Sequence, residues 1–155
     1  MYQEPLTKLQ ELKYVLERLN KEAVSELKKL FGNDYKNEAY KIIKNAKNEK
    51  FVIKLEKTKE PIGVYGLCGS NSKKTSSVGI FFLTTDNLNN GNKIKLLKGA
   101  KKQIALWETK YKLIMDSCHK DNRIVAKWLY LLGFKPSKFQ DDDIQIWYKG
   151  DLNEY

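Results

Sequence analysis

The run VGIFFLTTDNL at residues 78–88 is the feature that most restricts the fold. It is rich in β-branched and aromatic residues and apolar enough to be a strand at the centre of a sheet. A helical pattern follows at residues 94–110, and a second buried strand is predicted at residues 111–117. A helix between two parallel strands crosses over in the right-handed sense and covers one face of the sheet. The sequence therefore predicts an α/β domain with a mixed sheet.

Two amphipathic helices are predicted before this strand. Residues 21–32 place their apolar side chains on one helical stripe and end at Gly32, a natural helix terminator. Residues 33–50 repeat the arrangement and end in polar residues. The segment LKYVLERLN at residues 12–20 fits both the helical and the strand period poorly. We favour a strand there over a helical turn.

Short strands and loops account for much of the remaining chain. Residues 51–57 and 61–69 are two β-rich runs that predict a hairpin. Residues 70–77 are polar and predict a loop. Residues 142–150 alternate like an antiparallel strand.

Two further helices are expected in the second half. A polar turn at residues 89–93 leads into the helix at 94–110, and a shorter helix ends at Gly133. The apolar face of the longer helix is formed by Ile94, Leu97, Ile104, Leu106, Trp107 and Tyr111. The inward face of the shorter helix is formed by Ile124, Val125, Trp128, Leu129 and Leu132.

Composition limits the class of protein. The 155 residues, 41% of them hydrophobic, provide one core, so we predict a single domain over residues 1–155. No apolar run approaches the ~20 residues of a membrane span, and the N-terminus lacks the apolar segment of a secretory signal, so we expect a cytoplasmic protein with no membrane partner. Two cysteines, Cys68 and Cys118, and one histidine suggest neither a disulfide framework nor a zinc site. The three adjacent carboxylates in the run QDDD at residues 140–143 diverge, so a solvated turn is favoured over a metal site.

The formal charge of +10 attracts polyanions in general. These include nucleic acid, anionic membrane surfaces and the phosphates of a cofactor. Lysines occur along every predicted helix, and the sign of the charge does not choose among these partners.

A motif with defined spacing follows the second buried strand. Asn122 is followed by Val125 three positions later and by Gly133 and Phe134 from eleven positions later. Together with the order of elements across nearly the whole chain, this motif resembles the GNAT superfamily of acyl-CoA-dependent N-acyltransferases. The runs PIGVYGL and VGIFFLTTDNL look like the third and fourth strands of that fold. The FLTTDNL segment before a polar turn is similar to small acetyltransferase-like proteins of tailed phages, some of them virion-associated.

The resemblance implies a GNAT-like domain with a mostly antiparallel sheet, a central parallel strand pair splayed into a V, and helices on both faces. Main-chain groups of the splayed strands would bind the pantetheine arm of acetyl-CoA, and a helix N-terminus would face its phosphates. Carried over to this chain, the residues expected to bind acetyl-CoA are Leu83, Thr84, Thr85, Asn89, Asn90, Gly91, Asn92, Lys93 and Asn122.

The chain departs from the family pattern in two places. The phosphate loop usually carries closely spaced glycines, whereas NLNNGNKIK has only Gly91, which leaves a simple tight turn as an equal alternative. Family members often place a tyrosine seven residues after the asparagine as the general acid. Here Leu129 holds that position and Tyr130 is its neighbour, about 100° further around the helix.

Three residues are candidates for proton transfer. Tyr130 would protonate the departing thiolate, and Asp116 or His119 would accept a proton from the amine. Each has a structural alternative, since Tyr130 fits a partly exposed aromatic residue and the other two fit loop-capping roles. Asn122 also suits the N-cap of the following helix, and the two roles can coexist.

The leading hypothesis is an N-acetyltransferase that moves an acetyl group directly from acetyl-CoA to a primary amine of a protein or small molecule. The amine-bearing partner could be a host protein or an aminoacyl-tRNA, and the enzyme a monomer or a homodimer, encoded by a phage. The alternative is a non-catalytic protein of the same fold that binds nucleic acid or protein, or accompanies a virion.

Overall fold

The computed structural model describes residues 1–47, 49–69 and 77–151. The chain forms two compact units, each described by itself below. The first unit comprises Met1–Cys68 and Phe81–Asn92, and the second comprises Gly69–Ile80 and Lys93–Tyr155. The prediction of a single domain over residues 1–155 stays a prediction.

Seven strands form a mixed sheet in the order β1-β2-β3-β4-β5-β7-β6. Strand β4 is paired in parallel with β5, and the other registered pairs are antiparallel. The predicted mixed α/β fold is therefore confirmed. The strands are β1 (Tyr2–Pro5), β2 (Lys50–Lys54), β3 (Pro61–Cys68), β4 (Ser77–Thr84), β5 (Leu113–His119), β6 (Lys135–Gln140) and β7 (Ile144–Gly150).

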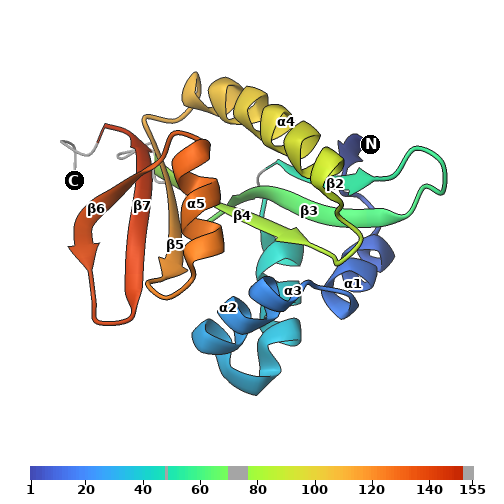
Figure 1. Ribbon diagram of the computed structural model, residues 1–155, viewed down its shortest axis with the longest axis horizontal. Coiled ribbons are helices and arrows are strands. Elements are labelled where there is room, and N and C mark those ends of the chain that lie inside the picture. Colours follow the sequence, from blue (N-terminus) through green and yellow to red (C-terminus); the bar gives the residue numbers. More distant parts are fainter. Residues whose placement is uncertain (48, 70–76, 152–155) are drawn as a thin grey trace. The chain divides into compact units, whose positions relative to one another are not determined.

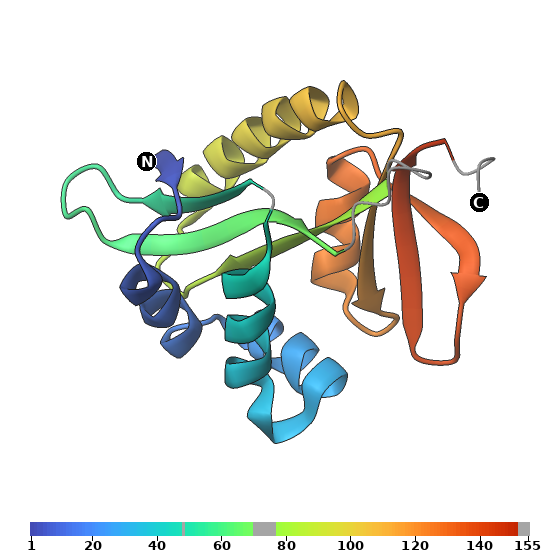
Figure 2. The same cartoon turned by 180° about the vertical axis from the view of Figure 1, so that it is seen from behind.

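Three helices pack on one face of the strands of the first unit (Figures 1 and 2). They are α1 (Leu9–Glu17), α2 (Lys21–Phe31) and α3 (Tyr35–Asn45), with a short 3-10 turn at Gly32–Asp34. Their apolar stripes meet the sheet in one buried cluster, which the strands enter through Val52, Val64 and Leu83. The helix predicted at residues 21–32 is confirmed, and Gly32 ends it with a φ of 74°.

The strand predicted at residues 12–20 is wrong, because Leu9–Glu17 forms helix α1. Leu12, Val15, Leu16 and Leu19 follow the i, i+3, i+4, i+7 spacing of a helical stripe, and all four are buried. In the sequence, Tyr14 interrupts the regular spacing of the apolar residues, but in the helix it lies at the edge of the stripe. One strand missing from the prediction is β1, which pairs with β2.

The hairpin predicted from residues 51–57 and 61–69 is confirmed as β2 and β3. The register places Val52 opposite Val64 and Phe51 opposite Tyr65. The loop predicted at residues 70–77 lies outside the described residues except for Ser77, which begins β4.

The second unit contains α4 (Asn90–Glu108), although residues 90–92 of that helix belong to the first unit, and α5 (Arg123–Leu131). Helix α5 lies against one face of β5 and β7 (Figures 1 and 2). The polar turn predicted at residues 89–93 is wrong, because Asn90 already begins α4. Gly133, with a φ of 93°, follows α5 as predicted.

The apolar face predicted for α4 is partly wrong. Ile94 and Leu106 are 59% and 60% exposed. The buried face consists of Leu96, Ala100, Ile104 and Trp107. These four positions follow one helical stripe that the two exposed residues lie outside. In α5, Ile124 is also exposed, at 51%, instead of inward.

Strand β7 confirms the strand predicted near the C-terminus, whereas β6 was not predicted. The sequence of β6, KPSKFQ, lacks regular alternation, and most of its side chains are exposed. Within the ranges that the structure describes, no helix has the length and apolar character needed to cross a membrane.

Candidate functional site

The parallel ladder between β4 and β5 is short. It pairs Ser77 with Leu113, Val78 with Ile114, and Gly79 with Met115. Strand β4 continues to Thr84, and β5 continues to His119 in unbroken pairing with β7. In the described part of the chain, the two parallel strands thus share three registered pairs at their N-terminal ends. Residues 80–84 and 116–119 extend beyond this ladder.

The end of β4 is held from two sides within the first unit. Thr85 donates its main-chain N–H to the Ile62 carbonyl of β3, 2.9 Å away. On the opposite edge, the Thr84 carbonyl accepts the Asn20 main-chain N–H at 3.0 Å. The Asn20 amide also donates to Thr84 Oγ1 at 2.7 Å. The Thr84 carbonyl and the Thr85 N–H, which were both predicted to serve a ligand, are therefore used by the protein itself.

Strand alternation identifies another residue at the same edge. Main-chain groups of successive residues in a strand point to opposite edges. The main-chain groups of Thr85 point toward β3, and those of Thr84 point away from it. The main-chain groups of Phe82, two residues before Thr84, therefore also point away from β3. Its side chain stacks on Tyr65, with ring centroids 5.5 Å apart. Sequence reasoning missed Phe82. The signal that identifies it is the alternation of main-chain direction along β4, counted from the contact of Thr85 with β3.

The loop after β4 is fixed by a polar network in the first unit. Asn87 donates its side-chain amide to Glu60 Oε2 at 2.9 Å, and the Tyr14 hydroxyl donates to Glu60 Oε1 at 2.7 Å. The hydrogen bond to Glu60 raises the pKa of Tyr14 above its usual value. The Arg18 guanidinium lies 3.6 Å from the Tyr14 ring centroid. This network ties α1, the β2–β3 turn and the loop together.

Asn89 acts as the N-cap of α4. Its Oδ1 accepts the Asn92 N–H at 2.8 Å. Asn90, Gly91 and Asn92 form the first turn of the helix, and the exposed Lys93 follows them. The N-terminal turn of a 19-residue helix carries a partial positive charge, which Lys93 reinforces. The predicted phosphate-binding segment is thus a capped helix start, with one of its amides already bonded to Asn89.

The β5 residues proposed for proton transfer point to opposite faces of the strand. Asp116 and His119 are three positions apart, so their side chains alternate to different sides. The Asp116 carboxylate accepts the Ser117 N–H at 2.8 Å. His119 Nδ1 accepts the Asp121 N–H at 3.2 Å and lies 3.6 Å from the Asp121 carboxylate. The two residues therefore cannot act together on one amine from one face.

Trp147 is the cross-strand partner of Asp116 in the β5–β7 register. Directly opposed residues lie on the same face of a sheet, with Cβ atoms about 5 Å apart. The indole Nε1 of Trp147 is buried, and among the described residues it has no hydrogen-bond acceptor. A buried N–H donor without an acceptor costs free energy.

Helix α5 places two predicted site residues differently. Asn122 is its N-cap, with Oδ1 accepting the Val125 N–H at 3.2 Å. Tyr130 is 70% exposed, and Leu129, at the position of the family tyrosine, is 3% exposed. The predicted N-cap role of Asn122 is therefore confirmed, while the Tyr130 side chain lies in solvent.

Comparisons with known proteins rest on structure alone, because the sequence matches no family description and no curated protein. The GNAT domain of Streptomyces lividans PAT has a TM-score of 0.71 at 12% identity, over 95% of this chain and 88% of that one. The ribosomal-protein-alanine N-acetyltransferase from Brucella melitensis has a TM-score of 0.67 at 15% identity, over 97% of this chain and 100% of that one. The chain has the GNAT fold. A variant of the spermidine N-acetyltransferase SpeG from Vibrio cholerae covers 96% of this chain and 94% of its own, with a TM-score of 0.62 at 12% identity.

The fold predicted from the Asn122 and Gly133-Phe134 spacing is confirmed across nearly the whole chain. These identities are too low to carry an activity, and the likeness to tailed-phage proteins stays a prediction.

Proposed function

We propose that the protein transfers an acetyl group from acetyl-CoA to a primary amine. The observation that carries this proposal is the β4–β5 ladder, which ends at Gly79 and Met115 although both strands continue. An extended ligand arm can form main-chain hydrogen bonds along the edge of a strand. In a GNAT fold, this is where we place the pantetheine arm.

The residues present suit acetyl-CoA at three points. The acyl-pantetheine would lie along β4 before Thr84, because the Thr84 carbonyl and the Thr85 N–H are already used within the protein. The first turn of α4, with Asn90, Gly91 and Lys93, would face the phosphates. Asn122, at the start of α5, would contact the pantetheine while it caps the helix.

The proposed reaction is a direct transfer. The amine nitrogen bonds to the acetyl carbon, the carbon–sulfur bond breaks, and the amine proton is lost as the thiolate is protonated. Acetyl-CoA supplies the thioester. Positioning and main-chain N–H donors lower the barrier, and proton transfer by side chains is secondary.

Asp116 is the residue we place as proton acceptor. It follows the last pair of the β4–β5 ladder, so it stands where β5 leaves β4. The Trp147 side chain lies on the same face of the sheet as Asp116. His119 is the second candidate and serves the other face. Tyr130 is the weakest of the three because its ring is in solvent.

The acceptor is proposed only as a class. Structurally similar enzymes are named for spermidine and for the alanine of a ribosomal protein. Both kinds of acceptor present an amine, so a polyamine or a protein amine, including one of a host protein, is the substrate class to test first. An aminoacyl-tRNA is a further amine of this class.

A non-catalytic role is the second candidate. One observation favours it: the start of α4 has a single glycine, and Asn89 already occupies the Asn92 N–H. A chain that has lost phosphate binding would keep the fold and bind only macromolecules.

Thermal unfolding with acetyl-CoA separates the two candidates. A ligand present at ~100 times its dissociation constant stabilises the native state by about 2.7 kcal/mol and raises Tm by several degrees. Free-thiol release with spermidine and with an amine-bearing peptide then tests transfer. No change in Tm at millimolar acetyl-CoA would favour the non-catalytic role.

A further inference from the structure

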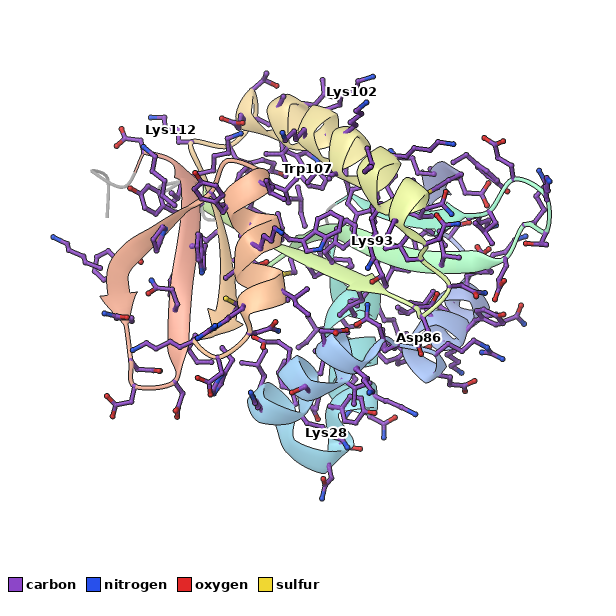
Figure 3. The ribbon with its side chains drawn as sticks, in the orientation of Figure 1. Lys28, Asp86, Lys93, Lys102, Trp107 and Lys112 are labelled. Carbon is purple, nitrogen blue, oxygen red and sulfur yellow. The ribbon has the colours of Figure 1, made fainter. Side chains whose placement is uncertain are left out.

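The outer face of α4 carries a stripe of lysines. Lys95, Lys98 and Lys102 are spaced i, i+3 and i+7, so they lie within ~60° of one another around the helix, over about 10 Å of its length. All three side chains are exposed, as is the flanking Lys101. We call Lys95, Lys98 and Lys102 the lysine stripe. Figure 3 shows Lys102 on the outer side of α4 and Trp107 on its opposite, inner side.

The stripe has no local charge compensation. No acidic residue occurs between Asn90 and Glu108 along α4. The ion pairs found among the described residues include none of the three lysines. Like charges at i, i+3 and i, i+4 destabilise a helix by a few tenths of a kcal/mol each. A polyanion would relieve this repulsion.

The chemistry of the face argues against a membrane and against a protein interface. A membrane-surface helix needs a continuous apolar band, whereas the exposed Ile94 and Leu106 lie on opposite sides of the stripe and ~18 Å apart along the axis. Protein interfaces are depleted in lysine and depend on buried aromatic or arginine anchors. The lysine stripe contains neither an aromatic residue nor an arginine.

The same face indicates which form of nucleic acid fits. Single strands are bound through aromatic side chains that stack on bases, but the α4 tryptophan, Trp107, is only 2% exposed and faces inward. The stripe has no arginine, asparagine or glutamine to recognise base edges. Gly99 and Ala105 lie beside the lysines and have little or no side chain, so a broad ligand can approach the backbone of the helix closely. Lysine contacts to phosphate oxygens carry no sequence information.

We propose that the lysine stripe of α4 binds the phosphodiester backbone of a nucleic-acid duplex without reading its sequence. Because the contacts are to phosphates only, RNA and DNA duplexes bind alike. This site is separate from acetyl-CoA binding, which involves the first turn of α4 and not the stripe.

Salt-dependent binding to RNA and DNA duplexes of equal length tests this proposal. The test variant combines Lys95→Gln, Lys98→Gln and Lys102→Gln, since glutamine has a similar helix propensity. The control combines Lys21→Gln, Lys36→Gln and Lys47→Gln, three exposed lysines of the first unit, and loses the same charge. Thermal unfolding confirms that both variants are folded. Single-stranded RNA, polyglutamate, and phosphatidylserine–phosphatidylcholine vesicles are the comparison ligands.

The wild type should bind both duplexes with a linear dependence of log K on log salt concentration. Each lost phosphate contact lowers that slope by about 0.9, so the stripe variant should lose about 3 and bind about tenfold more weakly at moderate salt. The control should keep its slope within about 1. The proposal is wrong if neither duplex binds at low salt, or if both variants lose affinity equally. It is also wrong if single strands, polyglutamate or vesicles bind more tightly than the duplexes. None of these readouts involves acetyl-CoA, so failure here leaves the acetyltransferase proposal unaffected.

Discussion

Asn20 holds Thr84 through two hydrogen bonds, from its main-chain N–H to the Thr84 carbonyl and from its side-chain amide to Thr84 Oγ1. Its Oδ1 at the same time accepts the Ala23 N–H at 2.8 Å, which caps α2. One side chain therefore joins the start of a helix to the end of the strand on which we place the acyl donor. The position of α2 and the course of β4 depend on each other through this residue.

A double-mutant cycle on this pair tests the connection. Asn20→Ala should cost about 1–2 kcal/mol of unfolding free energy, because it removes a helix cap and a partly buried hydrogen bond. Thr84→Val keeps the shape of the side chain and should cost about 1 kcal/mol. The double variant should cost less than the sum by about 0.5–1.5 kcal/mol in urea unfolding. Full additivity would show that the side-chain bond contributes nothing.

A comparison of Asn122→Ala with Tyr130→Phe tests the α5 site. Asn122→Ala should weaken acetyl-CoA binding severalfold and lower stability by about 1 kcal/mol, because it also removes the α5 cap. Tyr130→Phe should leave binding and turnover unchanged, because the ring is 70% exposed. Calorimetric titration and thiol release measure the two effects, and Asn122→Ser, which restores a cap, separates capping from ligand contact. A large loss of turnover in Tyr130→Phe would return that residue to the role of proton donor.

Two glycines, Gly66 in the first unit and Gly99 in the second, make a matched pair that tests the space around each Cβ position. A Cβ on Gly66 would collide with the Glu49 carbonyl and would lie 2.9 Å from the Lys50 Cα, both of them backbone atoms. Gly66→Ala should therefore cost about 2–3 kcal/mol. Gly99, in the middle of α4, has open space around its Cβ position, so Gly99→Ala should gain about 1 kcal/mol. Opposite signs in urea unfolding are the expected result, and a neutral Gly66→Ala would contradict the register of β2 and β3.

Lys54 lies buried between the carboxylates of Glu4 and Glu11. Hydrogen bonds, first with Glu11 and then with Glu4, raise the pKa of Lys54, and the bond from Lys54 lowers the pKa of Glu4. Lys54→Met leaves both carboxylates without this partner and should lower Tm by about 5 °C at neutral pH. The exposed Lys57→Met is the control and should change Tm little.

The pH dependence of this loss has a definite sign. A carboxyl whose pKa is lowered in the folded state contributes stability above its usual pKa, and that contribution is lost as the pH falls through the lowered value. The difference in Tm between wild type and Lys54→Met should therefore shrink in acid. A difference that is constant from pH 7 to pH 3 would show that packing of the Lys54 stem, not its charge, stabilises the native state.

Much of the fold was readable from local patterns. The order of elements and the Asn122, Gly133-Phe134 motif gave the family resemblance from which the fold was predicted. Gly32 and Gly133 mark helix ends because both adopt a positive φ that other residues avoid. The missed elements lack such signals. Helix α1 was predicted as a strand because Tyr14 obscures the helical spacing of Leu12, Val15 and Leu16. Strand β6 was missed because its sequence has no regular alternation of apolar and polar residues.

The site was harder to read because it depends on contacts between distant segments. Nothing near Thr84 in the sequence indicates that Asn20, 64 residues away, occupies its carbonyl. The same holds for Trp147, whose indole became a candidate only through the register that places it opposite Asp116. The residue types suggested the proposed chemistry, whereas the strand pairing shows which of these residues lie near one another.

Hydrogen–deuterium exchange with and without acetyl-CoA tests the central proposal most directly. We expect acetyl-CoA to slow amide exchange in residues 80–84 of β4, in residues 116–119 of β5 and in the first turn of α4, while β2 is unchanged. That pattern would place the acyl donor along the edge where the β4–β5 ladder ends. Unchanged exchange in all three segments at millimolar acetyl-CoA would contradict the proposal that this GNAT fold binds the acyl donor there.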